Sequence, residues 1–141
     1  MIFQSGKHAG QEAAYVLLRD PGHAAFIMDQ YPDGKVAKEF KRLAAVLDAK
    51  PFLQSCTTCS HTATRATTYA GGPSLYFWCD DCDVHGMGAT EGKLIVVRRF
   101  KDALRYGATT RGEQKSVIKS LAEAKGGPAR LTQAAAKAFL P

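Results

Sequence analysis

Two CxxC pairs decide the fold of this chain: Cys56-Thr57-Thr58-Cys59 and, after nineteen further residues, Cys79-Asp80-Asp81-Cys82. They contain all four cysteines of the 141 residues. Two residues between paired cysteines allow a tight turn to aim both thiolates at one ion, and two such turns complete a tetrahedral set of thiolates. The spacing therefore predicts one structural Zn²⁺ held by Cys56, Cys59, Cys79 and Cys82. A complete set of four thiolates leaves no position for a catalytic water.

The residues around the pairs predict strands. Residues 62–69 are rich in Thr, the turn Ala70-Gly71-Gly72-Pro73 follows, residues 74–78 are rich in aromatic side chains and residues 93–97 in β-branched ones. Residues 51–97 thus resemble a four-cysteine zinc ribbon. We expect an α+β fold in which a zinc-ribbon β-hairpin, extended to a three-stranded sheet, packs with flanking helices. In such a hairpin Tyr76 and Trp78 face one side, and Leu75 and Phe77 face the other.

Other uses of the thiols stay open. Two disulfides require an oxidising compartment, and a redox CxxC pair requires no metal. His61 and His85, which follow the pairs closely, could replace a thiolate, although exposed or capping histidines are the simpler interpretation. The first residues lack the apolar core of a signal peptide, and no apolar run reaches transmembrane length. We therefore expect a cytoplasmic protein with no membrane partner.

Helical patterns flank the ribbon on both sides. They cover residues 11–19, 23–30 and 35–49 before it and residues 98–106, 110–125 and 129–140 after it, with Asp20 as a candidate cap. The chain thus divides into 1–50, 51–97 and 98–141, which we expect to form one compact body. The predicted core residues of the helices include Phe26, Ile27, Val36, Phe40, Leu43, Ala44, Leu47, Val117, Ile118, Leu121, Leu131, Phe139 and Leu140.

Two short motifs stand in the first thirty residues. The run Phe3-Gln4-Ser5-Gly6-Lys7-His8-Ala9-Gly10 precedes a short helix, and Asp20-Pro21-Gly22-His23-Ala24-Ala25-Phe26-Ile27 follows it. This order resembles the exodeoxyribonuclease X-type C-terminal module, a small unit appended to DNA-processing proteins. His23 and Phe26 depart from its pattern, which favours an aromatic and Trp there. The resemblance implies a nucleic-acid context without catalysis. Independently, Gly6 and Gly10 predict a turn that presents Lys7 to a phosphate, or an ordinary glycine turn.

The net charge of +6 is concentrated at the end of the chain. Residues 93–141 carry eleven Lys/Arg against three Asp/Glu, whereas residues 51–92 carry one against four. Basic residues recur at helical spacing, and few acids are interleaved with them. They are either a solvated surface or a nucleic-acid interface. The candidate contacts are Lys7, Arg98, Arg99, Lys101, Arg105, Arg111, Lys115 and Lys119.

No catalytic motif is apparent. Asp80, Asp81 and Asp83 form the densest acidic group, but they overlap the second CxxC pair and read as its polar rim. We therefore expect a non-catalytic accessory protein that binds Zn²⁺ and, without sequence specificity, nucleic acid, with DNA favoured over RNA. A DNA-processing protein is a second expected partner. Tyr69, Tyr76, Phe77 and Trp78 could stack on bases if exposed. The alternatives are a zinc-stabilised protein-interaction adaptor and a subunit of a nuclease whose carboxylates lie on another chain.

Overall fold

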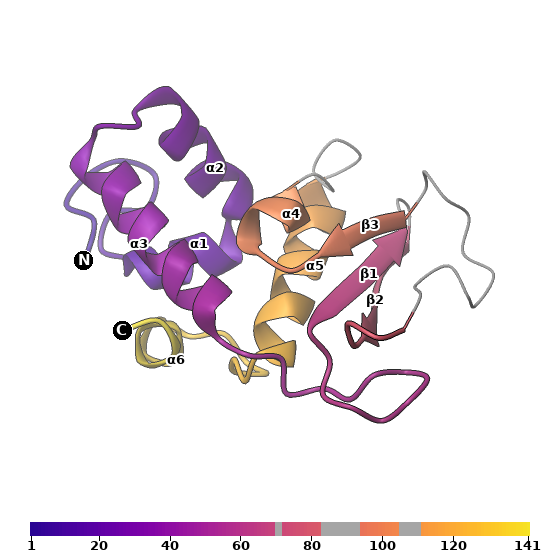
Figure 1. Cartoon of the computed structure of the whole chain (residues 1–141). Helices are drawn as coiled ribbons and strands as arrows, with labels where there is room; N and C mark the ends of the chain where they lie inside the picture. Colours follow the sequence, from indigo (N-terminus) through magenta and orange to yellow (C-terminus); the bar gives the residue numbers. More distant parts are fainter. Residues whose placement is uncertain (70–71, 83–93, 105–110) are drawn as a thin grey trace.

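The computed structural model describes residues 1–69, 72–82, 94–104 and 111–141, with the side chains of residues 72, 73 and 111 excepted. Its helices and one three-stranded antiparallel sheet confirm the predicted α+β class (Figure 1). In chain order the elements are α1 (Ala13–Arg19), α2 (Pro21–Gln30), α3 (Lys35–Ala49), β1 (Arg65–Tyr69), β2 (Gly72–Trp78), β3 (Leu94–Val97), α4 (Phe100–Leu104), α5 (Arg111–Ala124) and α6 (Gln133–Phe139).

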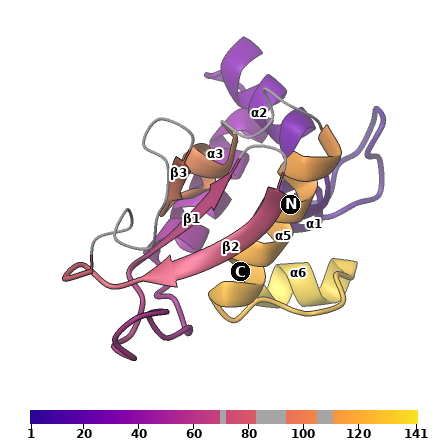
Figure 2. The same cartoon turned by 90° about the vertical axis from the view of Figure 1, so that its right-hand side faces the viewer.

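The sheet has the order β2-β1-β3, so the third strand pairs with β1 (Figure 2). The strand predicted from residue 62 begins only at Arg65. Thr62 instead forms an isolated bridge with Ser55, which closes the loop that carries the first two cysteines. The hairpin therefore starts where this loop ends.

The two faces of the sheet differ, as alternation along a strand requires. Ala66 of β1 pairs with Phe77 of β2 and with Val97 of β3. The face of the sheet that carries these three side chains joins the hydrophobic core. Helix α5 packs against β2 and also contacts α1 and α2, so it lies between the sheet and the N-terminal helices (Figure 1). The opposite face carries Tyr76 and Trp78.

The N-terminal helices follow their sequence signals closely. Asp20 caps α2 by accepting a hydrogen bond from the His23 backbone N–H at 3.4 Å, and Pro21 occupies the first turn. Gly6 and Gly10 have φ of +83° and +81°, which explains the glycines of the predicted turn. The prediction that Phe26 joins the core is wrong, because its side chain is 55% exposed. The apolar residues of α2 are spread around the helix, so their pattern does not determine which face is buried.

One hydrophobic cluster draws on all three segments of the chain. Of the predicted core residues, Phe40, Leu43, Leu47, Val117, Ile118, Leu121 and Leu140 are buried in it, and Ile27, Val36, Ala44, Leu131 and Phe139 pack partly against it. Polar contacts also join the ends of the chain: the Glu12 backbone N–H donates to Gln133 Oε1 at 2.7 Å beside α6. Among the residues described, no helix is both long and apolar enough to cross a bilayer.

Candidate metal centre and basic groove

Two loops bring the four cysteines together. The first loop is closed by the Ser55–Thr62 bridge and by a hydrogen bond of 2.6 Å from the Cys56 N–H to the His61 carbonyl. Within it Ser60 adopts φ of +65°, a left-handed conformation that lets the chain reverse directly after Cys59. The second loop follows β2. The Thr57 N–H donates to the Phe77 carbonyl at 2.9 Å, which fixes the first loop beside the end of β2.

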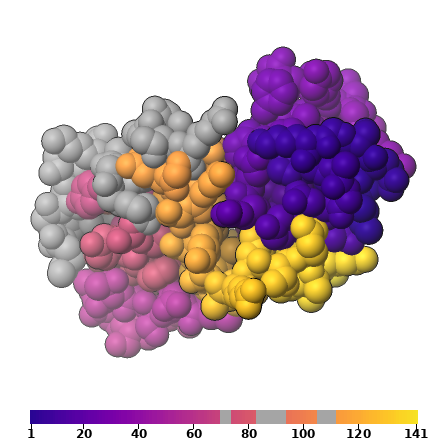
Figure 3. All heavy atoms as spheres, turned by 180° about the vertical axis from the view of Figure 1, so that it is seen from behind, coloured from indigo at the N-terminus to yellow at the C-terminus, as the bar shows by residue number. Residues whose placement is uncertain are grey.

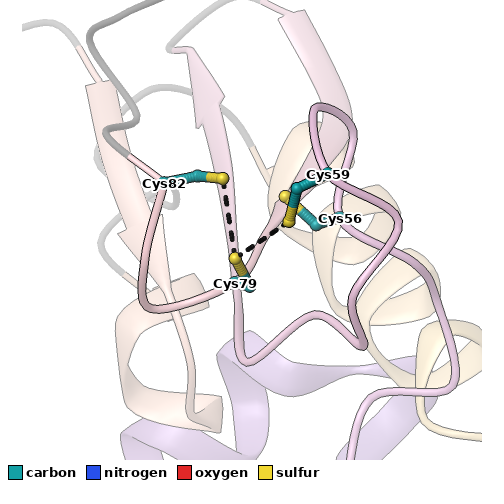
Figure 4. Close-up of side chains that lie close together, drawn as sticks. All are labelled: Cys56, Cys59, Cys79 and Cys82. Carbon is teal, nitrogen blue, oxygen red and sulfur yellow. Dashed lines mark hydrogen bonds between the residues drawn. The ribbon is translucent and has the colours of Figure 1, made fainter.

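The sulfur atoms converge as a group of four (Figure 4). Cys79 Sγ lies 3.3 Å from Cys59 Sγ and 3.6 Å from Cys82 Sγ, and all four sulfurs lie within 4.8 Å of one another. Tetrahedral thiolates about 2.3 Å from a metal are separated by about 3.8 Å. All four cysteines are free, and the sulfurs are not arranged as two bonded pairs. The cluster can therefore hold a metal ion.

Hydroxyl and backbone groups orient the sulfurs. The Thr58 hydroxyl donates to Cys82 Sγ at 2.9 Å and lies 3.4 Å from Cys56 Sγ, so it links one cysteine of each pair. Arg65 Nη2 donates to the Cys82 carbonyl at 2.6 Å and ties the second loop to β1. Groups of this kind fix ligand orientation in metal sites and tune metal affinity.

The thiols differ in acidity because they share one small volume. The hydrogen bond between its thiol and the Thr58 side chain is the main cause that lowers the pKa of Cys56, to about 5. A backbone hydrogen bond from His61 lowers the pKa of Cys59, but the three neighbouring thiols and burial outweigh it and raise that pKa to about 12. In the metal-free chain one thiolate thus forms readily and another thiol keeps its proton. A bound cation would remove this difference.

The histidine and acidic candidates lie at the edge of the cluster. His61 Nδ1 is 3.3 Å from Cys59 Sγ, and the exposed His61 and Asp81 form a second possible ligand group with Cys79. Asp80 accepts a hydrogen bond from the Thr64 hydroxyl at 2.7 Å, which fits the predicted polar rim. His85 and Asp83 lie outside the described residues. The four sulfurs therefore remain the most complete ligand set within the described ranges.

The predicted basic contacts do not form one surface. Lys7, Lys115 and Lys119 line cavities beside α5, whereas Arg98 and Arg99 line a separate cavity of about 570 Å³ with Asp48 and Lys125. The exposed Lys101 lines none of the described cavities. Arg105 and the side chain of Arg111 lie outside the described residues.

Few acids are interleaved with these cations in the sequence, but the fold places an acid close to four of them. Asp20 is 3.1 Å from Lys7, and Glu123 is 3.9 Å from Lys119. Asp80 and Asp102 are each 4.0 Å from an arginine, Arg98 and Arg99 respectively. Asp20 and Asp80 are distant in sequence from their partners, so these two contacts depend on the fold, whereas Asp102 and Glu123 lie one helical turn from theirs.

A basic groove of about 490 Å³ lies between α1, α5 and residues 128–131. Four cations line it: Arg19, Lys115, Lys119 and Arg130. None of the described lining residues is an acid. Figure 3 shows α5 (orange) at the surface beside the N-terminal segment (indigo) and the C-terminal segment (yellow). Arg19 and Arg130 are not among the predicted contacts, because they are far apart along the chain and carry no shared motif.

Only one of the predicted stacking aromatics is well exposed. Trp78 is 5% exposed and its Nε1 donates to the Thr67 hydroxyl at 2.8 Å, so its ring is engaged inside the protein. Phe77 packs partly against the core. Tyr69 is half-buried, and Tyr76 is 50% exposed. The sheet therefore offers Tyr76, and not an aromatic row, to a ligand.

No known family model, curated protein or solved structure matches this chain. The resemblance of the first thirty residues to the exodeoxyribonuclease X-type module stays a prediction.

Proposed function

We propose that the four-cysteine cluster binds one structural Zn²⁺ and that the protein is a non-catalytic accessory factor that binds nucleic acid through the basic groove. Four thiolates are a ligand set that favours Zn²⁺ in a structural role. The loops that carry them contribute few residues to the core, so metal binding would supply folding free energy. The arrangement of the sulfurs, described above, carries the zinc part of this proposal.

Metal content tests the zinc part directly. Protein purified without added metal chelators should contain one Zn²⁺ per chain by elemental analysis. Cys79→Ser should lose this zinc and unfold at lower temperature, because Cys79 is the sulfur with two close sulfur neighbours. Ser74→Ala, on the exposed side of β2, is the matched control and should keep both. Intact disulfides by mass spectrometry, or no bound metal, would refute this part.

The basic groove carries the nucleic-acid part. Its four cations come from α1, α5 and the segment before α6, so the fold converges them on one hollow. A phosphodiester backbone is a repeating anion that such a group of cations can bind, and its contacts are independent of base sequence. The resemblance in the first thirty residues favours DNA over RNA and a DNA-processing protein as a further partner.

A salt titration tests the groove. Each phosphate neutralised on a single strand contributes about −0.7 to the slope of log K against log salt. Replacing Lys115 and Lys119 with Gln should flatten the slope by about 1.4. The matched control replaces Lys38 and Lys41, two exposed lysines of α3 that line none of the described cavities. Equal slopes for the two double variants would reject the groove. A parent protein that binds no DNA or RNA would favour the protein-interaction adaptor.

A further inference from the structure

A cluster of polar side chains adjoins the basic groove. Asp20 accepts from Lys7 Nζ at 3.1 Å and lies 3.1 Å from His8 Nε2, while His8 Nδ1 is 2.7 Å from Gln11 Oε1. The rings of His8 and His23 lie 4.7 Å apart between centroids. Burial raises the pKa of Asp20, but hydrogen bonds from Lys7 and His8 outweigh it and lower that pKa. The Asp20 carboxylate therefore pairs with the Lys7 ammonium and caps α2. It does not stand as an isolated negative charge.

Two cavities meet at this cluster. One, of about 290 Å³, is lined by Lys7, His23 and Lys115 together with Asp20 and Gln114. The other, of about 390 Å³, is mostly apolar, with Phe3, Ile27, Tyr31 and Val36 in its lining. Lys7 and His23 line both cavities, and Lys115 also lines the basic groove. An apolar hollow, a pair of ammonium groups and the groove thus follow one another along the surface.

The succession of the apolar cavity, the smaller cavity and the basic groove fits one kind of ligand. A nucleotide joins a flat, weakly polar ring to an anionic phosphate, and the apolar cavity lies in the size range of small-molecule sites. Tyr31, 60% exposed, lines the apolar cavity, and Phe26, 55% exposed, lines the smaller one. Their ring centroids lie 6.5 Å apart. Exposed aromatic rings beside cations are the usual means of holding an unpaired base. Burial and the charge of His8 lower the pKa of His23, which favours the neutral imidazole beside the apolar cavity.

We propose that one unpaired nucleotide of a bound strand inserts its base into the apolar cavity, with its phosphate between Lys7 and Lys115 and the adjoining strand in the basic groove. This inference rests on the proposed nucleic-acid binding and names its substrate class: single-stranded nucleic acid, or a duplex with an unpaired end. It also assigns a role to the exposed Phe26 and to the Lys7 turn. Duplex without unpaired bases would engage only the groove.

The test compares oligonucleotides that differ only in their bases. A 12-nucleotide oligothymidylate and an abasic strand of the same length carry the same phosphates. The zinc-loaded protein should bind the thymidylate about tenfold more tightly, in line with stacking of one base. Ser5→Leu places an aliphatic side chain in the lining of the apolar cavity from an exposed residue and should remove this preference. Gln4→Leu, at its exposed neighbour outside the described cavity lining, should retain it.

The outcomes separate this inference from the proposal on which it rests. Equal affinity for the two strands, with the salt slope intact, would overturn the nucleotide site and leave the groove. A preference that survives in Ser5→Leu would place the base contact elsewhere and would also overturn it. If neither strand binds, both proposals fail. Thymidine monophosphate should compete weakly with the thymidylate strand, and its competition should also disappear in Ser5→Leu.

Discussion

The buried ammonium of Lys125 should stabilise the protein measurably, although the residue looks like an ordinary surface lysine in the sequence. Only 5% of Lys125 is exposed, at the end of α5. Its Nζ donates to the carbonyls of Leu47 at 3.1 Å, Asp48 at 3.4 Å and Arg98 at 3.3 Å. The first two are carbonyls of the last turn of α3, and the Leu47 carbonyl also accepts from the backbone N–H of Lys50 at 3.1 Å. One side chain thus joins α3, α5 and the segment before α4.

Lys125→Met keeps the length and apolar stem of the side chain and removes only the ammonium. A hydrogen bond to a charged group contributes about 1.5–3 kcal/mol, but moving the ammonium out of water offsets part of the three bonds. We therefore expect a net loss close to one strong bond, about 2–3 kcal/mol. At a typical urea dependence for a small protein, this loss lowers the unfolding midpoint by about 1–2 M.

Urea unfolding of the zinc-loaded protein measures this loss, with Lys101→Met as the exposed control on α4. A loss below about 0.5 kcal/mol would show that the three hydrogen bonds only offset desolvation. The pH dependence gives an independent check. Burial lowers the pKa of Lys125 below its usual 10.5, and Asp48 opposes this. Between the lowered pKa and 10.5 the unfolded chain binds more protons, so wild-type stability relative to Lys125→Met should rise with pH in that window.

Three further predictions concern the four cysteines and the sheet beside them. Thr58→Val removes the hydroxyl that donates to Cys82 Sγ, and should weaken zinc affinity about 10–100-fold in a competition titration; unchanged affinity would contradict its orienting role. Trp78→Phe leaves the buried Thr67 hydroxyl unpaired and should cost about 1–3 kcal/mol in urea unfolding, whereas a neutral change would show that Thr67 finds another partner. Because the pKa of Cys59 is raised to about 12 without metal, zinc uptake should release protons and strengthen with pH, measurable by calorimetry in buffers of different ionisation enthalpy; pH-independent binding would contradict four-thiolate coordination.

The sequence predicted the features that depend on short-range spacing. Cysteines two residues apart and an intervening hairpin suffice to bring four sulfurs together, since β1 and β2 pair antiparallel. The third strand was equally predictable from its β-branched residues. The predicted cap at Asp20 needed only the Asp-Pro step before α2.

The features that sequence analysis missed depend on tertiary contacts. Arg19 and Arg130 meet only because α1 and the segment before α6 pack beside α5. Lys125 resembles the exposed lysines of α5 until the end of α3 is placed against it. The same applies to Phe26, whose helix has no strongly apolar face to fix its direction. The local sequence pattern carries no information on which of these residues lie close together in the fold.

Helix α5 connects the metal centre to the groove. Its apolar residues Val117, Ile118 and Leu121 enter the core, where α5 packs against β2, while Lys115 and Lys119 line the groove on its other side. The end of β2 leads directly into Cys79, so the proposed zinc would anchor the strand on which α5 rests. A helix with one face in the core holds its opposite face in a defined position. In the proposed function the zinc therefore contributes to binding by fixing the support of two groove lysines, without contacting the nucleic acid.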